Sequence, residues 1–173
     1  DMLLAEVARA MQRRGLHLAG SIQATAARRD GCRCGMTLED LATGHRIDTF
    51  EDRGPLARGC RLNAHALEEA VGLACASLTP GIDLVIINRF GKREAEGRGF
   101  RPVIETAVDM AIPVLIAVNT AQSEAWYQFT GSEAASMTPT RGKIAAWCDA
   151  AMRVRQSSAH QPPHLVDPAA DAG

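Results

Sequence analysis

The first hydrophobic positions of the chain recur at the spacing of a helix. They are Leu3, Leu4, Val7, Ala8 and Met11. Positions three and four apart share one face of a helix, and a glycine such as Gly15 commonly follows a helix end, so the pattern predicts an amphipathic helix. An α/β domain often places a strand and a phosphate-binding turn before its first helix. Because the chain opens at Asp1 within the helical pattern, we expect both to lie upstream of residue 1.

Three short strands are expected next. The segments are residues 16–25, 36–41 and 45–50. Gly44 supplies the left-handed residue that a short three-residue turn requires, so the second and third segments predict a hairpin. Asn63 can then cap a helix running to about residue 78, where Thr79-Pro80-Gly81 ends it.

The strongest strand signal is the unbroken apolar run at residues 83–88. Such runs are typical of parallel strands buried on both faces. A helix starting near Pro102 and a second apolar run at residues 113–119 follow it. This order of strand, helix and strand predicts parallel pairing, so Asn88 and Asn119 should end neighbouring or nearby strands at the same edge of the sheet.

The last expected elements are a helix near residues 123–130, a short strand near 134–137 and a helix near 140–154. From residue 156 to 173 the composition is mainly Ser, His, Pro, Ala and Asp, with little to bury, so we expect a disordered tail. The chain has 173 residues, 46% of them hydrophobic, which suits one α/β domain over residues 1–155.

Composition and charge limit which binding partners and which cellular compartment we expect. The formal net charge of -1 gives no overall attraction to nucleic acid or to an anionic membrane surface. No apolar run reaches the roughly 18 to 20 residues of a membrane-spanning helix, and no secretory signal pattern opens the chain, so we expect a cytoplasmic protein. The odd set of 5 cysteines argues against a secreted disulfide framework and favours reduced thiols.

Beyond residues 83–88 the chain enters a loop rich in glycine and positive charge. Its cations are Arg89, Lys92, Arg93, Arg98 and Arg101, its acids are Glu94 and Glu96, and its glycines are Gly91, Gly97 and Gly99. Ligands of parallel α/β sheets bind beyond the carboxyl ends of the strands, and glycine lets backbone amides approach an anion. We therefore expect a small anionic ligand of the phosphate type at this loop. The alternative is a solvated loop whose charges keep the surface wet.

The machinery for phosphoryl transfer is incomplete in these residues. The phosphate-binding pattern G-x-x-x-x-G-K-[ST] is absent from the sequence. Magnesium-assisted transfer usually needs a carboxylate at the end of a core strand, whereas this strand ends in Asn88 and Arg89. Glu94 and Glu96 are candidate acid, base or water-positioning groups, although exposed loop glutamates more often serve as surface charge.

The cysteines form a second candidate site. Cys34 lies with Cys32 in an arginine-rich loop, and Cys60 lies next to another arginine. Nearby arginines lower the pKa of a thiol and favour the thiolate, which suits a metal, a soft oxyanion or a regulatory disulfide. The C-x-C spacing differs from that of a common zinc knuckle. Cys75 and Cys148 fit the role of small core residues instead.

The chain carries three motifs in order: Cys34-Gly-Met-Thr-Leu38, Gly59-Cys-Arg-Leu-Asn63 and Asn88-Arg-Phe-Gly-Lys-Arg-Glu-Ala-Glu-Gly-Arg-Gly99. Together they resemble an uncharacterised bacterial family, a domain of unknown function, over roughly residues 1 to 150. That family is similar to a divergent branch of the thermophilic-type nucleoside-triphosphatases, and some members are linked with molybdenum transport. The resemblance implies a P-loop NTPase-like three-layer sandwich with a mostly parallel sheet and an inserted β-hairpin. It also implies ATP or GTP with magnesium as the ligand.

The resemblance places the triphosphatase motif Asp-Glu-Ile-Gly-Lys-Met-Glu on residues 88–94. Its two leading carboxylates correspond to Asn88 and Arg89, so the charge that would hold a metal is lost at one position and reversed at the other. The motif's glycine, lysine and final glutamate are retained. The resemblance therefore implies a nucleotide-binding ancestor, with hydrolysis in doubt.

The leading prediction is a nucleotide- or phosphate-anion-binding protein. Its expected anion contacts are Asn88, Arg89, Gly91, Lys92, Arg93 and Arg98, with Glu94 as the candidate catalytic residue. An alternative is a non-enzymatic carrier or sensor that binds a metal or an oxyanion such as molybdate through Cys34 and Cys60. A third is a catalytically inactive subunit that binds a protein partner or forms a homo-oligomer, which a large exposed apolar patch would favour.

Overall fold

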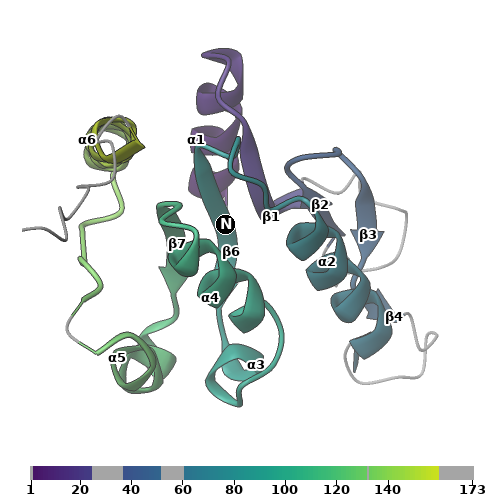
Figure 1. Ribbon diagram of the computed structural model, residues 1–173. Coiled ribbons are helices and arrows are strands. Elements are labelled where there is room, and N and C mark those ends of the chain that lie inside the picture. The colour runs from purple at the N-terminus through teal and green to yellow at the C-terminus, as the bar shows by residue number, and fades with distance from the viewer. Residues whose placement is uncertain (1, 25–36, 52–60, 132, 160–173) are drawn as a thin grey trace, which may run out of the picture.

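A five-stranded sheet organises the molecule (Figure 1). The computed structural model describes residues 2–24, 37–51, 61–131 and 133–159. In spatial order the strands are β3 (Arg46–Asp48), β2 (Thr37–Asp40), β1 (Leu18–Ala24), β6 (Leu84–Phe90) and β7 (Val114–Val118). The short strands β4 (Phe50–Glu51) and β5 (Arg61–Leu62) form a separate antiparallel pair.

The five-stranded sheet is mixed. β1, β6 and β7 run parallel, whereas β2 pairs antiparallel with both β1 and β3. The predicted α/β class, the hairpin within residues 36–50 and the parallel pairing of β6 with β7 are therefore confirmed. This pairing brings Asn88 and Asn119 to the same edge of the sheet, where the parallel strands have their carboxyl ends.

Helices cover both faces of the sheet. α1 (Met2–Arg13) and α6 (Arg141–Ala159) contribute to the core on one face, and α2 (Ala64–Ala76) and α4 (Arg101–Asp109) to the core on the other. Alternation along β6 explains the two cores, because Leu84 and Ile86 join the first whereas Val85 and Ile87 join the second. An unbroken apolar run is what a strand buried on both faces requires.

Three short elements lie near the carboxyl edge of the parallel strands (Figure 1). They are α3 (Lys92–Ala95), the 3-10 turn Thr120–Gln122 and α5 (Ser123–Thr130). α5 has the predicted bounds. α3 lies within the segment predicted to be a loop, and that prediction was wrong because Glu94 binds the backbone at the start of α3 and so supports a helical turn.

Sequence signals located the start of α2 and the approximate position of α6. Asn63 caps α2 as predicted, since its Oδ1 accepts a hydrogen bond from the Ala66 N–H at 3.0 Å. α6 continues to Ala159, beyond the predicted end at residue 154. Near that end Arg155 donates to the carbonyl oxygens of Ala111 and Pro80, at 3.1 and 2.8 Å. These bonds tie α6 to the loops that precede β7 and β6.

The prediction of a strand at residues 134–137 was wrong. Residues 133–140 form no strand. A strand needs a neighbour with which to exchange backbone hydrogen bonds. Residues 133–137 and β7 both line one large cavity, so open space lies beside this segment instead of a pairing partner.

β1 and β6 approach each other closely at Gly20. Its φ of +97° is left-handed, and a Cβ atom there would lie 2.2 Å from the carbonyl oxygen of Ile86. The Leu41 N–H donates to the Gly20 carbonyl oxygen at 2.9 Å, just past the end of β2. Only glycine fits this point, where the hairpin joins the parallel strands.

Some predictions concern residues outside the described ranges. Cys34 and Cys60, the predicted metal ligands, lie there, and so do residues 160–173 of the predicted tail. Within the part of the chain that the structure describes, no helix is long and apolar enough to cross a membrane.

Candidate functional site

The candidate site is residues 88–101, called the charged segment below. It leaves the sheet at the carboxyl end of β6, forms α3, and turns back through Gly97 and Gly99 into α4. Its position beyond the carboxyl ends of the parallel strands is where open α/β sheets bind their ligands. The segment therefore lies where the sequence predicted a ligand.

Glu94 lies at the centre of the charged segment. Its side chain is buried, with 5% of the residue exposed. Oε2 accepts a hydrogen bond from the Gly91 N–H at 2.9 Å, and Oε1 accepts one from the Phe100 N–H at 3.1 Å. A buried carboxylate is costly unless it is hydrogen-bonded, and these two amides meet that need. Glu94 thus joins the beginning of the turn to its end.

Gly99 makes room for this arrangement. Its φ of +61° is left-handed, and a Cβ atom there would lie 2.1 Å from Oε1 of Glu94 and 3.0 Å from its Cδ. Gly97 is also left-handed, at φ +81°, but has nothing within 4 Å of the position of a Cβ. Gly99 is therefore required both by its backbone conformation and by the glutamate beside it.

The cations of the charged segment lie on its outer surface. Arg89, Lys92 and Arg98 are exposed, and Arg93 is half-buried. The Arg98 N–H donates to the Arg93 carbonyl oxygen at 2.9 Å, so the backbone holds these two arginines at adjacent places in the turn. Lys92 Nζ lies 3.8 Å from a carboxylate oxygen of Glu96, and 84% of the lysine side chain is exposed. Such a surface pair contributes little to stability, so the lysine remains accessible to a ligand.

The two asparagines at the strand ends differ in their surroundings. Asn88 is buried at 6% exposure. Asn119 is exposed, and its Oδ1 accepts a hydrogen bond from the Ala121 N–H at 3.0 Å, which caps the 3-10 turn. The predicted edge is therefore formed, with one asparagine inside the protein and the other at its surface.

An aromatic cluster packs around Phe90, near the start of the charged segment. Phe90, the last residue of β6, packs edge-on against Trp126 with ring centroids 5.0 Å apart and stacks on Phe129 at 5.9 Å. Trp126 and Phe129 both come from α5, and both are partly buried side chains packed against the core cluster that contains Phe90. Tyr127, on the same helix, is 58% exposed.

Arg101 belongs to this packing rather than to the exposed cations. Its guanidinium carbon lies 4.2 Å from the centroid of the Phe129 ring, and its Nε donates to Oε1 of Glu105 at 3.0 Å. Cation–π contact and an i,i+4 ion pair together fix the side chain. The sequence signal for the ion pair was the spacing of four residues. No feature of the sequence near Arg101 predicts the contact with Phe129.

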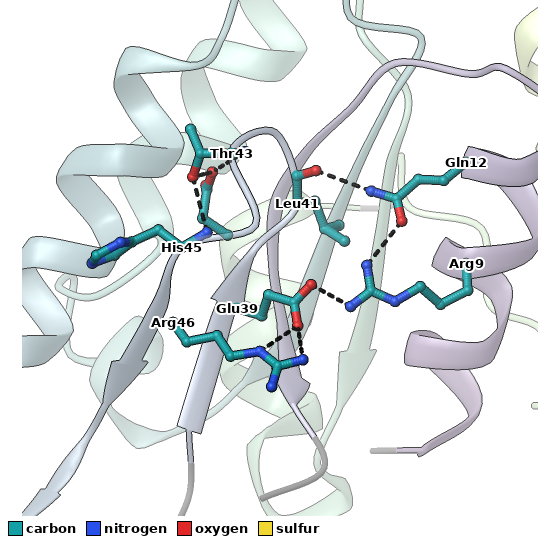
Figure 2. Close-up of polar contacts among 8 residues, drawn as sticks. Arg9, Gln12, Glu39, Leu41, Thr43, His45 and Arg46 are labelled. Atoms are coloured by element: carbon teal, nitrogen blue, oxygen red, sulfur yellow. Dashed lines mark hydrogen bonds and ion pairs between the residues drawn. The ribbon is translucent and has the colours of Figure 1, made fainter.

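A second polar cluster joins α1 to the β2–β3 hairpin and was missed by the sequence analysis (Figure 2). Glu39 of β2 is 4% exposed. It accepts hydrogen bonds from Arg9 of α1 and from Arg46 of β3, whose Nε lies 3.0 Å from Oε2. Arg9 also donates to Gln12 Oε1 at 2.9 Å, and Gln12 donates to the Leu41 carbonyl oxygen at 3.0 Å. This network fastens α1 to the hairpin.

The charge state of Glu39 follows from these contacts. Burial opposes ionisation, but the hydrogen bonds and positive charges of Arg9 and Arg46 outweigh it and lower the pKa of Glu39 below its ordinary value. Glu39 is therefore ionised at neutral pH, and both arginines of this cluster are paired with it, although the Arg46 side chain is 61% exposed.

The described cysteines behave as core residues. Cys148 is buried and Cys75 is half-buried. Burial, aided by the charge of Asp149, raises the pKa of Cys148 to about 11, and burial raises the pKa of Cys75. Both are neutral thiols at pH 7, as their predicted packing role requires. Among the residues with described coordinates, no group of three or more His, Cys, Asp or Glu side chains could hold a metal ion.

The class defined by this geometry is an α/β protein with a basic turn at the carboxyl edge of its parallel strands. Residues 1–147 match the family described as "Protein of unknown function (DUF2478)", and the chain belongs to that family.

Two curated proteins are similar to the chain. "Molybdenum import ATP-binding protein ModC 2" of Bradyrhizobium diazoefficiens is 37% identical over 147 residues, which are 85% of this chain and 16% of that protein. "Nucleoside-triphosphatase THEP1" of Methanosarcina barkeri is 26% identical over 106 residues, which are 60% of each chain. This chain thus spans less than two thirds of either relative. No solved structure matches it significantly. The predicted resemblance, to a family of unknown function with nucleoside-triphosphatase relatives, is confirmed.

Proposed function

We propose that the charged segment binds the phosphate groups of a nucleotide. The observation that carries this proposal is the fixed turn: Glu94 closes the segment from inside through two backbone amides, while Lys92 and Arg98 stay exposed on its outside. A turn of fixed shape loses little conformational freedom when an anion binds to it. The names of the two relatives, one an ATP-binding protein and one a nucleoside-triphosphatase, support a nucleotide as the source of the phosphate.

The same relationship supports a finer statement of the fold. The parallel strands β1, β6 and β7 with helices on both faces are compatible with a P-loop NTPase-like three-layer sandwich into which the β2–β3 hairpin is inserted. In that arrangement β6 is the strand that would carry metal-binding carboxylates, and Asn88 and Arg89 stand at their positions. Magnesium would then bind through the phosphates of the nucleotide rather than through these side chains.

Binding without efficient hydrolysis is the form of the proposal that fits Glu94. A general base must reach the water that it activates. Both carboxylate oxygens of Glu94 instead accept backbone hydrogen bonds in a buried position. Glu94 is accordingly a positioning residue, which shapes the turn that carries Lys92 and Arg93.

Calorimetric titration with ATP, GTP and inorganic phosphate, each with and without magnesium, tests the proposal. We expect saturable binding of a nucleotide that the double substitution Lys92→Ala, Arg98→Ala weakens at least about tenfold, because two charge-assisted contacts are lost. Lys143→Ala is the matched control, since Lys143 is an exposed cation on α6, far from α3 in the fold (Figure 1). Equal losses in the control and the double variant, or no nucleotide binding by the parent protein, would contradict the proposal.

The alternative of an oxyanion carrier is separated by the same titration. The name of one relative connects it with molybdenum import, but the same name describes an ATP-binding protein. Molybdate is therefore titrated alongside the nucleotides. Molybdate binding that persists in the Lys92→Ala, Arg98→Ala protein and disappears in Cys34→Ser would favour the predicted cysteine site over the charged segment.

A further inference from the structure

The side-chain oxygens of the charged segment offer little to a divalent cation. Magnesium takes about six oxygen ligands, and proteins supply them chiefly from carboxylates. Both carboxylate oxygens of Glu94 accept backbone hydrogen bonds. Glu96, the other acid of the segment, has a carboxylate oxygen 3.8 Å from Nζ of Lys92. One carboxylate is thus turned inward, and the other lies beside a cation.

The neighbouring elements do not add such ligands. Oδ1 of Asn119, at the end of β7, accepts the hydrogen bond that caps the 3-10 turn. On α4 the carboxylate of Glu105 pairs with Arg101. On α5 Oε1 of Glu124 accepts a hydrogen bond from Gln128 at 3.0 Å. The described side chains at this edge of the sheet therefore do not fit a magnesium ion held by the protein.

β6 contains a bulge at the first residues of the charged segment. Ile87 pairs with Ile116 and Phe90 with Val118, so β6 advances three residues where β7 advances two. The bulge explains why Ile87 and Phe90 join the same core cluster, which strict alternation would not allow. Arg89 lies between them and is exposed. The extra residue of β6 thus presents an arginine to solvent at the end of the strand.

Arg89 lies at the start of the turn that Glu94 closes. A Cβ atom on Gly91 would lie 3.8 Å from Cδ of Arg89 and 3.5 Å from Oε2 of Glu94, so the arginine side chain passes beside Gly91. At the far end of the turn, a Cβ atom on Gly99 would lie 3.4 Å from Cβ of Arg93. An arginine therefore lies beside a glycine at each end of the turn.

The charge balance of the segment favours a highly charged anion. Residues 88–101 include 5 cations and 2 acids. A magnesium ion bound to the phosphates of a nucleotide cancels part of their negative charge. It would gain no ligand from the side chains described above. Magnesium should therefore weaken the attraction between the nucleotide and the charged segment.

We propose that the charged segment selects the metal-free form of a nucleoside triphosphate, with the Arg89 guanidinium supplying the positive charge that a magnesium ion would otherwise bring. The proposal rests on the proposed function, because it names the form of the nucleotide that the segment binds. A guanidinium donates parallel hydrogen bonds to two phosphate oxygens, which suits this role. Magnesium and the protein then compete for the phosphates.

Calorimetric titration of the protein with ATP tests the proposal. One titration contains EDTA and the other contains magnesium in excess over ATP. Potassium chloride brings both to the same ionic strength, because salt alone screens surface charges. We expect ATP to bind about tenfold more tightly in EDTA. Inorganic phosphate, which binds magnesium far more weakly than ATP does, is the control ligand, and its affinity should be nearly the same in both buffers.

A charge reversal tests the role of Arg89. Arg89→Glu places a carboxylate at the end of β6, so the preference for metal-free ATP should fall from about tenfold to about one or below. Lys143→Glu is the matched control and should keep the preference, since Lys143 is an exposed cation on α6, far from α3 (Figure 1). The thermal midpoint of each variant shows that it remains folded.

The results distinguish this proposal from the proposed function. ATP that binds equally well or more tightly with magnesium would overturn the selection of the metal-free form and leave nucleotide binding intact. A preference that is the same in Arg89→Glu and in the parent protein would overturn the role of Arg89. Equal effects of magnesium on ATP and on inorganic phosphate would show that the metal acts on the protein, against the proposal. ATP that binds in neither buffer would contradict the proposed function itself.

Discussion

Two buried glutamates, Glu39 on β2 and Glu94 on α3, each organise the structure around them, and they do so with different partners. Glu39 binds two arginines from α1 and β3, whereas Glu94 binds two backbone amides of its own turn. The first arrangement uses its cations for structure. The second obtains a rigid turn without using any cation, so the arginines and lysine around it remain available. A buried acid satisfied by the backbone is therefore the better indicator of an anion site.

The largest effect should come from Gly99→Ala. The new methyl group meets the Glu94 carboxylate and the backbone remains left-handed, so we expect a loss of about 3 kcal/mol in unfolding free energy. Gly97→Ala keeps the backbone strain but has open space for the methyl group, so about 1 kcal/mol is expected. Chemical denaturation measures both. Equal losses would show that Glu94 does not hold the turn.

Glu94→Gln and Glu39→Gln compare the two acids directly. Each should cost about 2 kcal/mol in unfolding free energy, because one loses an acceptor for a backbone amide and the other loses two charged partners. Nucleotide affinity should fall only for Glu94→Gln. Calorimetric titration of both variants checks this, and an equal fall in affinity would remove the distinction between a structural cluster and a binding turn.

The stability conferred by Glu39 should depend on pH. Its pKa is lowered in the folded protein, so its contribution is fully present above the unfolded-state pKa of about 4.3 and is lost as the pH falls through the lower folded-state value. The difference in unfolding free energy between the parent protein and Glu39→Gln should be constant from pH 7 to 5.5 and shrink below about pH 4. Denaturation curves at a series of pH values measure it. A difference that grows in acid would reverse the sign of the argument.

The smallest expected change in stability comes from Arg101. It tests whether Arg101 is a structural cation and Arg98 a ligand-binding one. Arg101→Ala should lower the unfolding free energy by about 1 kcal/mol, because it removes the contact with Phe129 and the pair with Glu105, while nucleotide affinity stays unchanged. Arg98→Ala should do the opposite, with unchanged stability and weaker binding. Thermal denaturation and titration of both proteins test this. Arg101 would join the binding set if its loss reduced affinity as much as that of Arg98.

Local patterns allowed the parallel unit to be predicted. The apolar run before Asn88, the cap at Asn63 and the helix at 123–130 each carry their signal within a few neighbouring residues, and the structure has all three elements. The strand at 134–137 failed because strand formation depends on a neighbour that composition does not reveal.

The polar contacts of the site were less accessible to sequence analysis. The charged segment was located from its glycines and cations, but the inward position of Glu94 depends on the left-handed turn at Gly99. The Glu39 cluster could not be predicted, because Arg9 lies 30 residues away and reaches Glu39 only once α1 packs on the sheet. Long-range pairs of this kind leave no periodic trace in the sequence.

The positions of the two tryptophans give the protein an internal optical reporter. Trp126 and Trp147 are the only tryptophans of the chain, and both line the cavity beside β7. The intrinsic emission spectrum thus originates almost entirely from that cavity and needs no attached dye. Trp126 also touches Phe90 beneath the charged segment, whereas Trp147 belongs to α6. Replacing one indole at a time would therefore show whether a spectral change arises under the basic turn or beside the last helix.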